Sequence, residues 1–80
     1  MTEQNNYRLY LQTVGLFIKE DALKTKAELR DKTGSEKDFL LGKLLAYYEV
    51  VSTLRQHAAP LGIGLDELQM EDIEPDKHLT

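Results

Sequence analysis

The longest regular pattern of apolar residues lies between residues 38 and 58, in the stretch DFLLGKLLAYYEVVSTLRQHA. Its apolar residues recur with spacings that alternate between four and three, at Leu40, Leu44, Tyr47, Val51, Leu54 and Ala58. At about 100° per residue, these six positions form a stripe about 80° wide along one side of a helix. Neighbouring apolar residues widen the stripe on both flanks, so this helix is expected to contact more than one neighbour.

Turn and capping residues mark the limits of this helix. Gly34 suits the left-handed conformation that ends a preceding helix, and Ser35 is a candidate cap for the next one. Pro60 disfavours helical geometry at Ala59. We therefore predict a helix over about residues 36–59, preceded by a short connection at residues 33–35.

An earlier helix is predicted over about residues 6–32. One apolar stripe follows helical spacing through Tyr7, Leu11, Val14, Ile18, Ala22, Thr25 and Leu29. A second ridge, formed by Leu9, Leu16 and Leu23, recurs every seven residues and lies roughly 180° from the first stripe, with Phe17 beside it. Because a helix that is apolar on opposite sides is usually buried on both, we expect the second ridge to be an interface rather than three scattered surface leucines.

The short connection at residues 33–35 predicts that the two helices pack antiparallel. Folding the chain about Gly34 brings Asp21, which interrupts the first stripe, near Tyr47 and Lys43, where a hydrogen bond or an ion pair is expected. The predicted fold is all-α: a long antiparallel two-helix hairpin with a short C-terminal helical turn.

Eighty residues without a cysteine supply only a modest core and no disulfide framework. Association is the remaining common way to bury more apolar area. We therefore expect hairpins to form homodimers by coiled-coil-like packing, as a four-helix bundle. The expected interface residues lie on helix 1, along the second ridge and at Phe17, or on an outer flank of helix 2: Leu9, Leu16, Phe17, Leu23, Leu41, Leu45 and Tyr48.

Residues 65–80 form an acidic C-terminal segment. The chain has a net charge of −4. Lys77 is the one lysine or arginine of this segment, which contains six acidic residues: Asp66, Glu67, Glu71, Asp72, Glu74 and Asp76. Its apolar residues Leu65, Leu68, Met70 and Ile73 are too few for a core but enough to dock on one. Their acidic neighbours favour a segment that lies on the surface of the hairpin, or a short motif for another protein.

The charge pattern and the apolar pattern exclude several classes of partner. No basic footprint is present, so direct nucleic-acid binding is not expected. The polar start, MTEQNNYR, lacks the pattern of a signal peptide, and no apolar run approaches the ~20 residues that span a bilayer. We expect a cytoplasmic protein without membrane contact.

The candidate chemistry is sparse. His57 and His78 are the only histidines, and without cysteine they do not form a zinc site. No nucleophile–base arrangement, phosphate-binding loop or Glu-x-x-His spacing is present. We expect no enzymatic activity, no cofactor and no metal, and no motif is specific enough to identify a family.

These observations favour a small non-enzymatic interaction protein, an adaptor or regulator that acts as a homo-oligomer through helix-mediated contacts with itself and an unidentified protein. An alternative is an inhibitor whose acidic tail imitates phosphate in the groove of a nucleic-acid-binding protein. A third, less favoured possibility is a ligand-binding helical bundle with a polar site in the dimer core, for which Asp21 is the one candidate.

Overall fold

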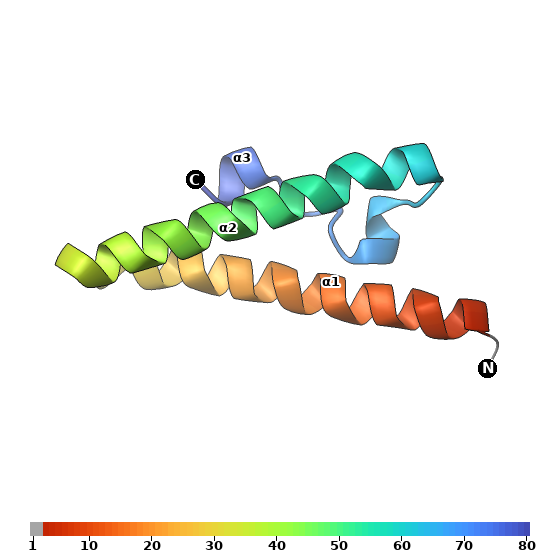
Figure 1. Cartoon of the computed structure of the whole chain (residues 1–80), viewed down its shortest axis with the longest axis horizontal. Coiled ribbons are helices and arrows are strands. Elements are labelled where there is room, and N and C mark those ends of the chain that lie inside the picture. The colour runs from red at the N-terminus through yellow and green to blue at the C-terminus, as the bar shows by residue number, and fades with distance from the viewer. Residues whose placement is uncertain (1–2) are drawn as a thin grey trace.

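The computed structural model describes residues 3–80 of the 80-residue chain, with side chains from residue 6 onward. Helix α1 (Glu3–Glu28) ends in a 3-10 turn, η1 (Leu29–Asp31), and runs antiparallel to helix α2 (Gly34–Ala58), which ends in the 3-10 turn η2 (Ala59–Leu61) (Figure 1). A third 3-10 turn, η3 (Leu65–Leu68), and the short helix α3 (Pro75–His78) follow. The described chain contains no strand, and the predicted all-α hairpin is confirmed.

The turn between the long helices depends on Gly34. Its φ of 62° is left-handed, a conformation that costs little only for glycine. Thr33 precedes α2 in an extended conformation and makes no side-chain capping bond. Because α2 begins at Gly34, Ser35 lies inside its first turn and the predicted Ser35 cap is wrong. At the other end the α-helix stops at Ala58, shortly before Pro60.

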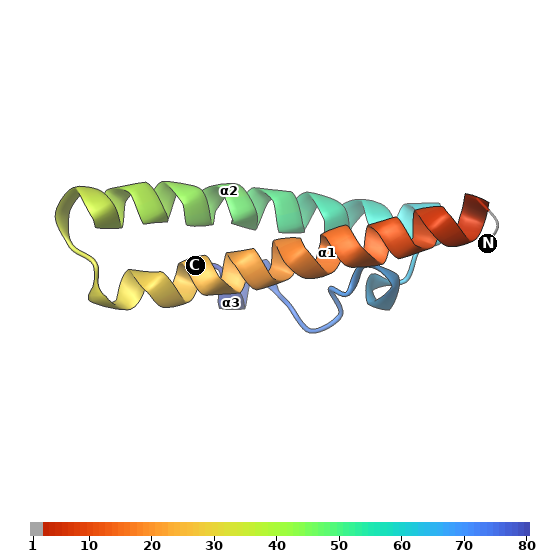
Figure 2. The same cartoon turned by 90° about the horizontal axis from the view of Figure 1, so that it is seen from below.

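Residues 65–80, which we call the tail, fold back along one side of the hairpin and complete its core. The tail passes behind α2 in Figure 1, and Figure 2 shows it on the same side of both long helices. Four of its apolar side chains are at most 5% exposed: Leu68, Met70, Ile73 and Leu79. The tail forms no separate core of its own and docks on that of the hairpin, as its few apolar residues predicted. These residues add to the core because the two helices already provide buried partners: Ala22, Leu44, Val51 and Ala58.

The closest approach of the tail to α1 occurs at Gly15. A Cβ atom at this position would lie 2.0 Å from the main-chain oxygen of Leu68, so only glycine leaves room for the backbone of η3. This contact also defines which side of α1 faces the tail. Phe17, two residues later and therefore about 200° around the helix, points to the opposite side.

Charged side chains of α1 fasten the tail along its length. Nη2 of Arg8 donates to Oε1 of Glu67 at 2.6 Å, and Nζ of Lys19 donates to Oδ1 of Asp72 at 3.0 Å. Further along α1, Nζ of Lys26 donates to the main-chain oxygen of Thr80. These donors have spacings of eleven and seven residues, which places them on the side of α1 that carries Gly15.

Two side chains of α2 hold the tail from the other side. Nη1 of Arg55 donates to the main-chain oxygens of Met70 at 2.7 Å and Ile73 at 2.5 Å. Seven residues earlier, the hydroxyl of Tyr48 donates to Oδ1 of Asp76 at 2.5 Å. The tail is thus bonded to both helices and closes one side of the groove between them.

The molecule is a thin slab, because the tail covers only one side of the hairpin. Its Cα atoms extend over 49 × 24 × 16 Å. Over residues 3–80, no helix is both long and apolar enough to cross a bilayer.

Candidate interaction surface

In the described part of the chain, exposed large hydrophobic residues outnumber buried hydrophobic residues. Among residues 6–80, nine hydrophobic residues are buried, two of them alanines. Eleven large hydrophobic side chains are exposed: Tyr7, Leu9, Tyr10, Leu11, Phe17, Leu23, Phe39, Leu41, Leu45, Val50 and Leu61. Apolar surface on this scale is typical of proteins that associate with another molecule.

The side of the hairpin opposite the tail has no other described segment over it (Figures 1 and 2). Phe17 points to this side because it lies about 200° around α1 from Gly15, and Tyr10 shares its direction seven residues earlier. On α2, Val50 and Phe39 lie about 200° and 180° around the helix from Tyr48, which faces the tail. We call Tyr10, Phe17, Phe39 and Val50, with exposed fractions of 67%, 58%, 70% and 43%, the uncovered face.

The second ridge lies on the outer side of α1, next to the tail. Leu16 follows Gly15 directly and is half-buried, while Leu9 and Leu23 are 52% and 41% exposed. Phe17 belongs to the uncovered face rather than to this ridge, because it lies about 100° further around the helix.

The outer flank of α2, defined by Leu41, Leu45 and Tyr48, is partly occupied by the tail. Leu41 and Leu45 are 45% and 58% exposed, whereas Tyr48 is half-buried and bonded to Asp76. A shallow apolar hollow of about 260 Å³ opens here, lined by Leu41, Leu44, Leu45, Tyr48, Leu79 and Thr80. The end of the tail thus forms one wall of a surface that the sequence assigned to α2 alone.

The structure does not bring the two sequence-predicted patches together. The second ridge and the outer flank of α2 lie on opposite edges of the molecule, with the tail between them. The uncovered face was not predicted as a unit, although its signals are present in the sequence. Tyr10 and Phe17 are seven residues apart, and Phe39 and Val50 lie on the same flank of the α2 stripe.

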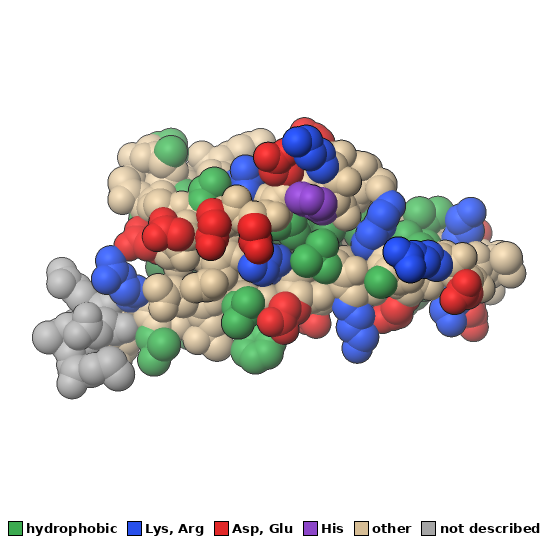
Figure 3. Space-filling model, turned by 180° about the vertical axis from the view of Figure 1, so that it is seen from behind, with side chains coloured by type: hydrophobic (Ala, Val, Ile, Leu, Met, Phe, Trp, Pro, Cys, Tyr) green, Lys and Arg blue, Asp and Glu red, His purple; other side chains and the backbone are tan. Residues whose placement is uncertain are grey.

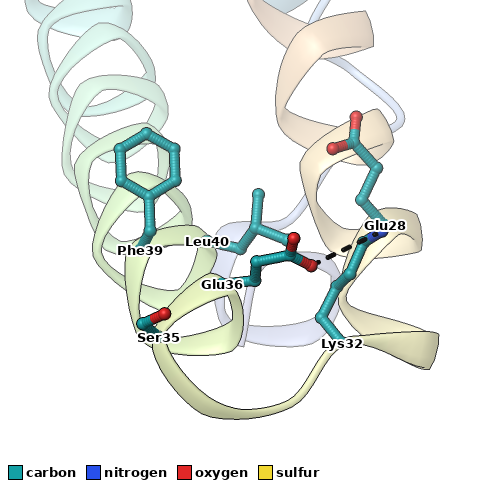
Figure 4. A pocket seen from close by; sticks show the side chains of 6 residues that line it. All are labelled: Glu28, Lys32, Ser35, Glu36, Phe39 and Leu40. Carbon is teal, nitrogen blue, oxygen red and sulfur yellow. Dashed lines mark ion pairs between the residues drawn. The ribbon is translucent and has the colours of Figure 1, made fainter.

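A second hollow lies at the turn end of the hairpin (Figure 4). It measures about 360 Å³ and is lined by Glu28, Lys32, Ser35, Glu36, Phe39 and Leu40. Nζ of Lys32 lies 3.9 Å from Oε2 of Glu36, an exposed pair four residues apart that contributes little to stability. Phe39 is the exposed apolar wall of this hollow, so the hollow marks the turn end of the uncovered face.

The two histidines belong to no cluster of metal-ligating side chains in the part of the chain that the structure describes. His57 is exposed at the end of α2, and Nδ1 of His78 accepts a hydrogen bond from the main-chain N–H of Glu74 at 2.9 Å. Among the side chains of residues 6–80, no three of His, Asp or Glu are placed to hold a metal ion. Asp21 is exposed, and among the described bonds its side chain makes neither the hydrogen bond nor the ion pair expected for it.

Three of the six acidic side chains of the tail, those of Glu67, Asp72 and Asp76, bond to the long helices. Figure 3 shows acidic and basic side chains close together over this side. The hydrogen bond from Arg8 lowers the pKa of Glu67 below its ordinary value of 4.5, and the N–H of Gly64 lowers it further. Lys19 lowers the pKa of Asp72 below 3.8 in the same way. The bond to Asp76 raises the pKa of the Tyr48 hydroxyl above 10.0.

These shifts predict that acid loosens the tail. A carboxyl group whose pKa is lowered by folding stabilises the folded state above its ordinary pKa, and that contribution is lost as the pH falls through the lowered value. For Glu67 and Asp72 the loss is therefore expected below about pH 4. Amide hydrogen exchange of residues 65–74, measured from pH 6 to pH 2.5 and corrected for intrinsic rates, should show it. In the Glu67→Gln, Asp72→Asn double variant this pH dependence should be smaller, and an unchanged profile would contradict the assignment.

Comparison with known proteins does not assign a family to this arrangement. The chain matches no family model, and no curated protein and no solved structure is significantly similar to it.

Proposed function

We propose that this protein is a small non-enzymatic interaction protein that acts as a homodimer, in the role of an adaptor or regulator. The observation that carries the proposal is the excess of exposed large hydrophobic residues over buried ones on a slab 16 Å thick. A single 80-residue core supplies only a few kcal/mol of stability, so pairing of apolar surfaces adds a substantial share.

The arrangement of the exposed residues supports both parts of this proposal. One apolar side can serve self-association while the two edges, the second ridge and the outer flank of α2, remain accessible for a different protein. Leu9 and Leu45 on these edges are each more than half exposed. A dimer would present each edge twice, which favours a role in bringing partners together.

The alternative of an acidic-tail inhibitor receives less support. A tail that imitates nucleic acid needs carboxylates free to face a basic groove. Glu67 and Asp72 are paired with α1, and Asp76 accepts a bond from Tyr48. Release of the tail would also expose its four buried apolar side chains, at about 2 kcal/mol for each.

The solution mass tests the proposal directly. Sedimentation equilibrium between about 1 and 100 μM should give twice the 9.2 kDa mass of one chain. The dimer should persist at high salt, because the proposed association is apolar. A wild-type protein that remains monomeric at the highest concentration would contradict self-association, and an association that salt abolishes would instead favour charged contacts.

A further inference from the structure

We propose that the uncovered face is the self-interface, and that two hairpins pack through it with their twofold axis parallel to the helices. This inference rests on the proposed homodimer and names the surface that forms it. In such a pair, α1 of one copy lies over α2 of its partner. The two tails remain on the outer sides of a four-helix layer.

The spacing of apolar residues on α1 supports this surface. Tyr7, Tyr10, Val14 and Phe17 follow one another at intervals of three, four and three residues, which is the spacing of a coiled-coil seam. Tyr7 and Tyr10 are both 67% exposed and Phe17 is 58% exposed, so a single chain leaves this seam largely unfilled.

Between Phe17 and the turn, the positions of the same seam are occupied by charged residues. Beyond Phe17, the next positions at intervals of four, three and four are Asp21, Lys24 and Glu28, and Lys43 lies at the corresponding level of α2. All four side chains are exposed, and none belongs to an ion pair among the described residues. Two acidic and two basic groups cancel, so a second copy can approach this half without net repulsion.

The order of apolar and charged positions selects the direction of the axis. With the axis parallel to the helices, the apolar half of one copy meets the apolar half of its partner, and the charged halves also meet. With the axis across the helices, full overlap would place Asp21 and Glu28 against the tyrosines of the partner. A partial overlap would leave Phe39, which is 70% exposed, outside the contact.

The exposed area reaches the lower limit for a specific contact. An aromatic side chain has about 200 Å² of surface. The three aromatic residues of the uncovered face, Tyr10, Phe17 and Phe39, and Tyr7 at its edge are 58–70% exposed. They can therefore bury about 500 Å² per copy, or about 1,000 Å² in the dimer, which reaches the lower limit for a specific interface.

Substitutions at two equally exposed residues distinguish this surface from the outer flank of α2. Phe17 and Leu45 are both 58% exposed, the first on the uncovered face and the second on the outer flank of α2. By sedimentation equilibrium, Phe17→Glu should raise the dimer dissociation constant at least about 30-fold, whereas Leu45→Glu should change it less than about threefold. Circular dichroism should show that both variants stay helical, and Tyr10→Glu replaces Phe17→Glu if the latter unfolds.

The direction of the twofold axis can be tested separately, by the distance between two spin labels. The chain has no cysteine, so Ser35→Cys gives a unique site for a spin label at the turn. A parallel axis brings the two turns to the same end, with labels about 20 Å apart across two packed helix layers. Labels separated by a distance approaching the 49 Å length of the hairpin would overturn the parallel axis.

The outcomes separate the two levels of the proposal. A monomeric wild type contradicts the homodimer itself. A wild-type dimer that tolerates Phe17→Glu but dissociates with Leu45→Glu keeps the proposed function and overturns the uncovered face as the self-interface.

Discussion

Replacement of Gly15 by alanine is expected to destabilise the protein by about 3 kcal/mol, although alanine is the better helix former. The new Cβ atom would lie 2.0 Å from the main-chain oxygen of Leu68, and a backbone atom cannot move aside as a flexible side chain can. The tail must shift, so Leu68 and Met70 lose part of their burial. Urea unfolding followed by circular dichroism measures the loss.

Gly42→Ala is the matched control for this prediction. Gly42 lies inside α2, and a Cβ atom there would meet nothing within 4 Å. The same substitution should therefore stabilise the protein by up to about 1 kcal/mol. If both glycine variants were stabilised alike, the close contact between η3 and α1 would be refuted.

Arg55→Leu is expected to cost about 3 kcal/mol. The substitution removes the donor of both bonds to the oxygens of Met70 and Ile73, two residues whose side chains are 0% and 1% exposed. Carbonyl oxygens left without a partner beside a core lose the full free energy of hydration. Thermal unfolding should show the loss, and amide exchange should locate it in the tail more than in the helices.

Two further variants serve as controls for Arg55→Leu. Arg55→Lys retains the charge but lacks the planar guanidinium fork, so it should recover only part of the stability. Arg30→Leu changes an exposed arginine at the turn and should stay within about 0.5 kcal/mol of the wild type. Equal losses for the leucine variants at residues 30 and 55 would show that arginine at residue 55 has no special role.

The hairpin was predictable because its signals are local. Alternating intervals of three and four residues identify both long helices, and Gly34 and Pro60 limit the second one. Docking of the tail was expected, but its place was not predictable in the same way. Leu68, Met70 and Ile73 are buried only in a groove between two helices that are distant from them in the sequence. Gly15 did not reveal that groove from the sequence, because Gly42 is equally isolated within a helical pattern and a Cβ atom there would meet nothing within 4 Å.

The grouping of the exposed apolar residues was predictable only in part, for a related reason. Periodicity shows which residues of one helix share a direction, but it does not show which direction the tail covers. Leu9, Leu23, Leu41 and Leu45 are exposed as a surface site requires, whereas Tyr48 is engaged by Asp76. The uncovered face can be recognised only from the structure, in which the contacts of Gly15 and Tyr48 show which side of each helix the tail occupies.

The bonds that fasten the tail also bear on the speed of folding. Those between α1 and the tail join residues that are 53 to 59 positions apart, whereas α1 and α2 meet across a short turn. Long loops close late, so the hairpin is expected to form before the tail docks. Interactions made after the transition state slow unfolding and leave the folding rate nearly unchanged. The tail therefore determines how long each native molecule lasts, more than how quickly it forms.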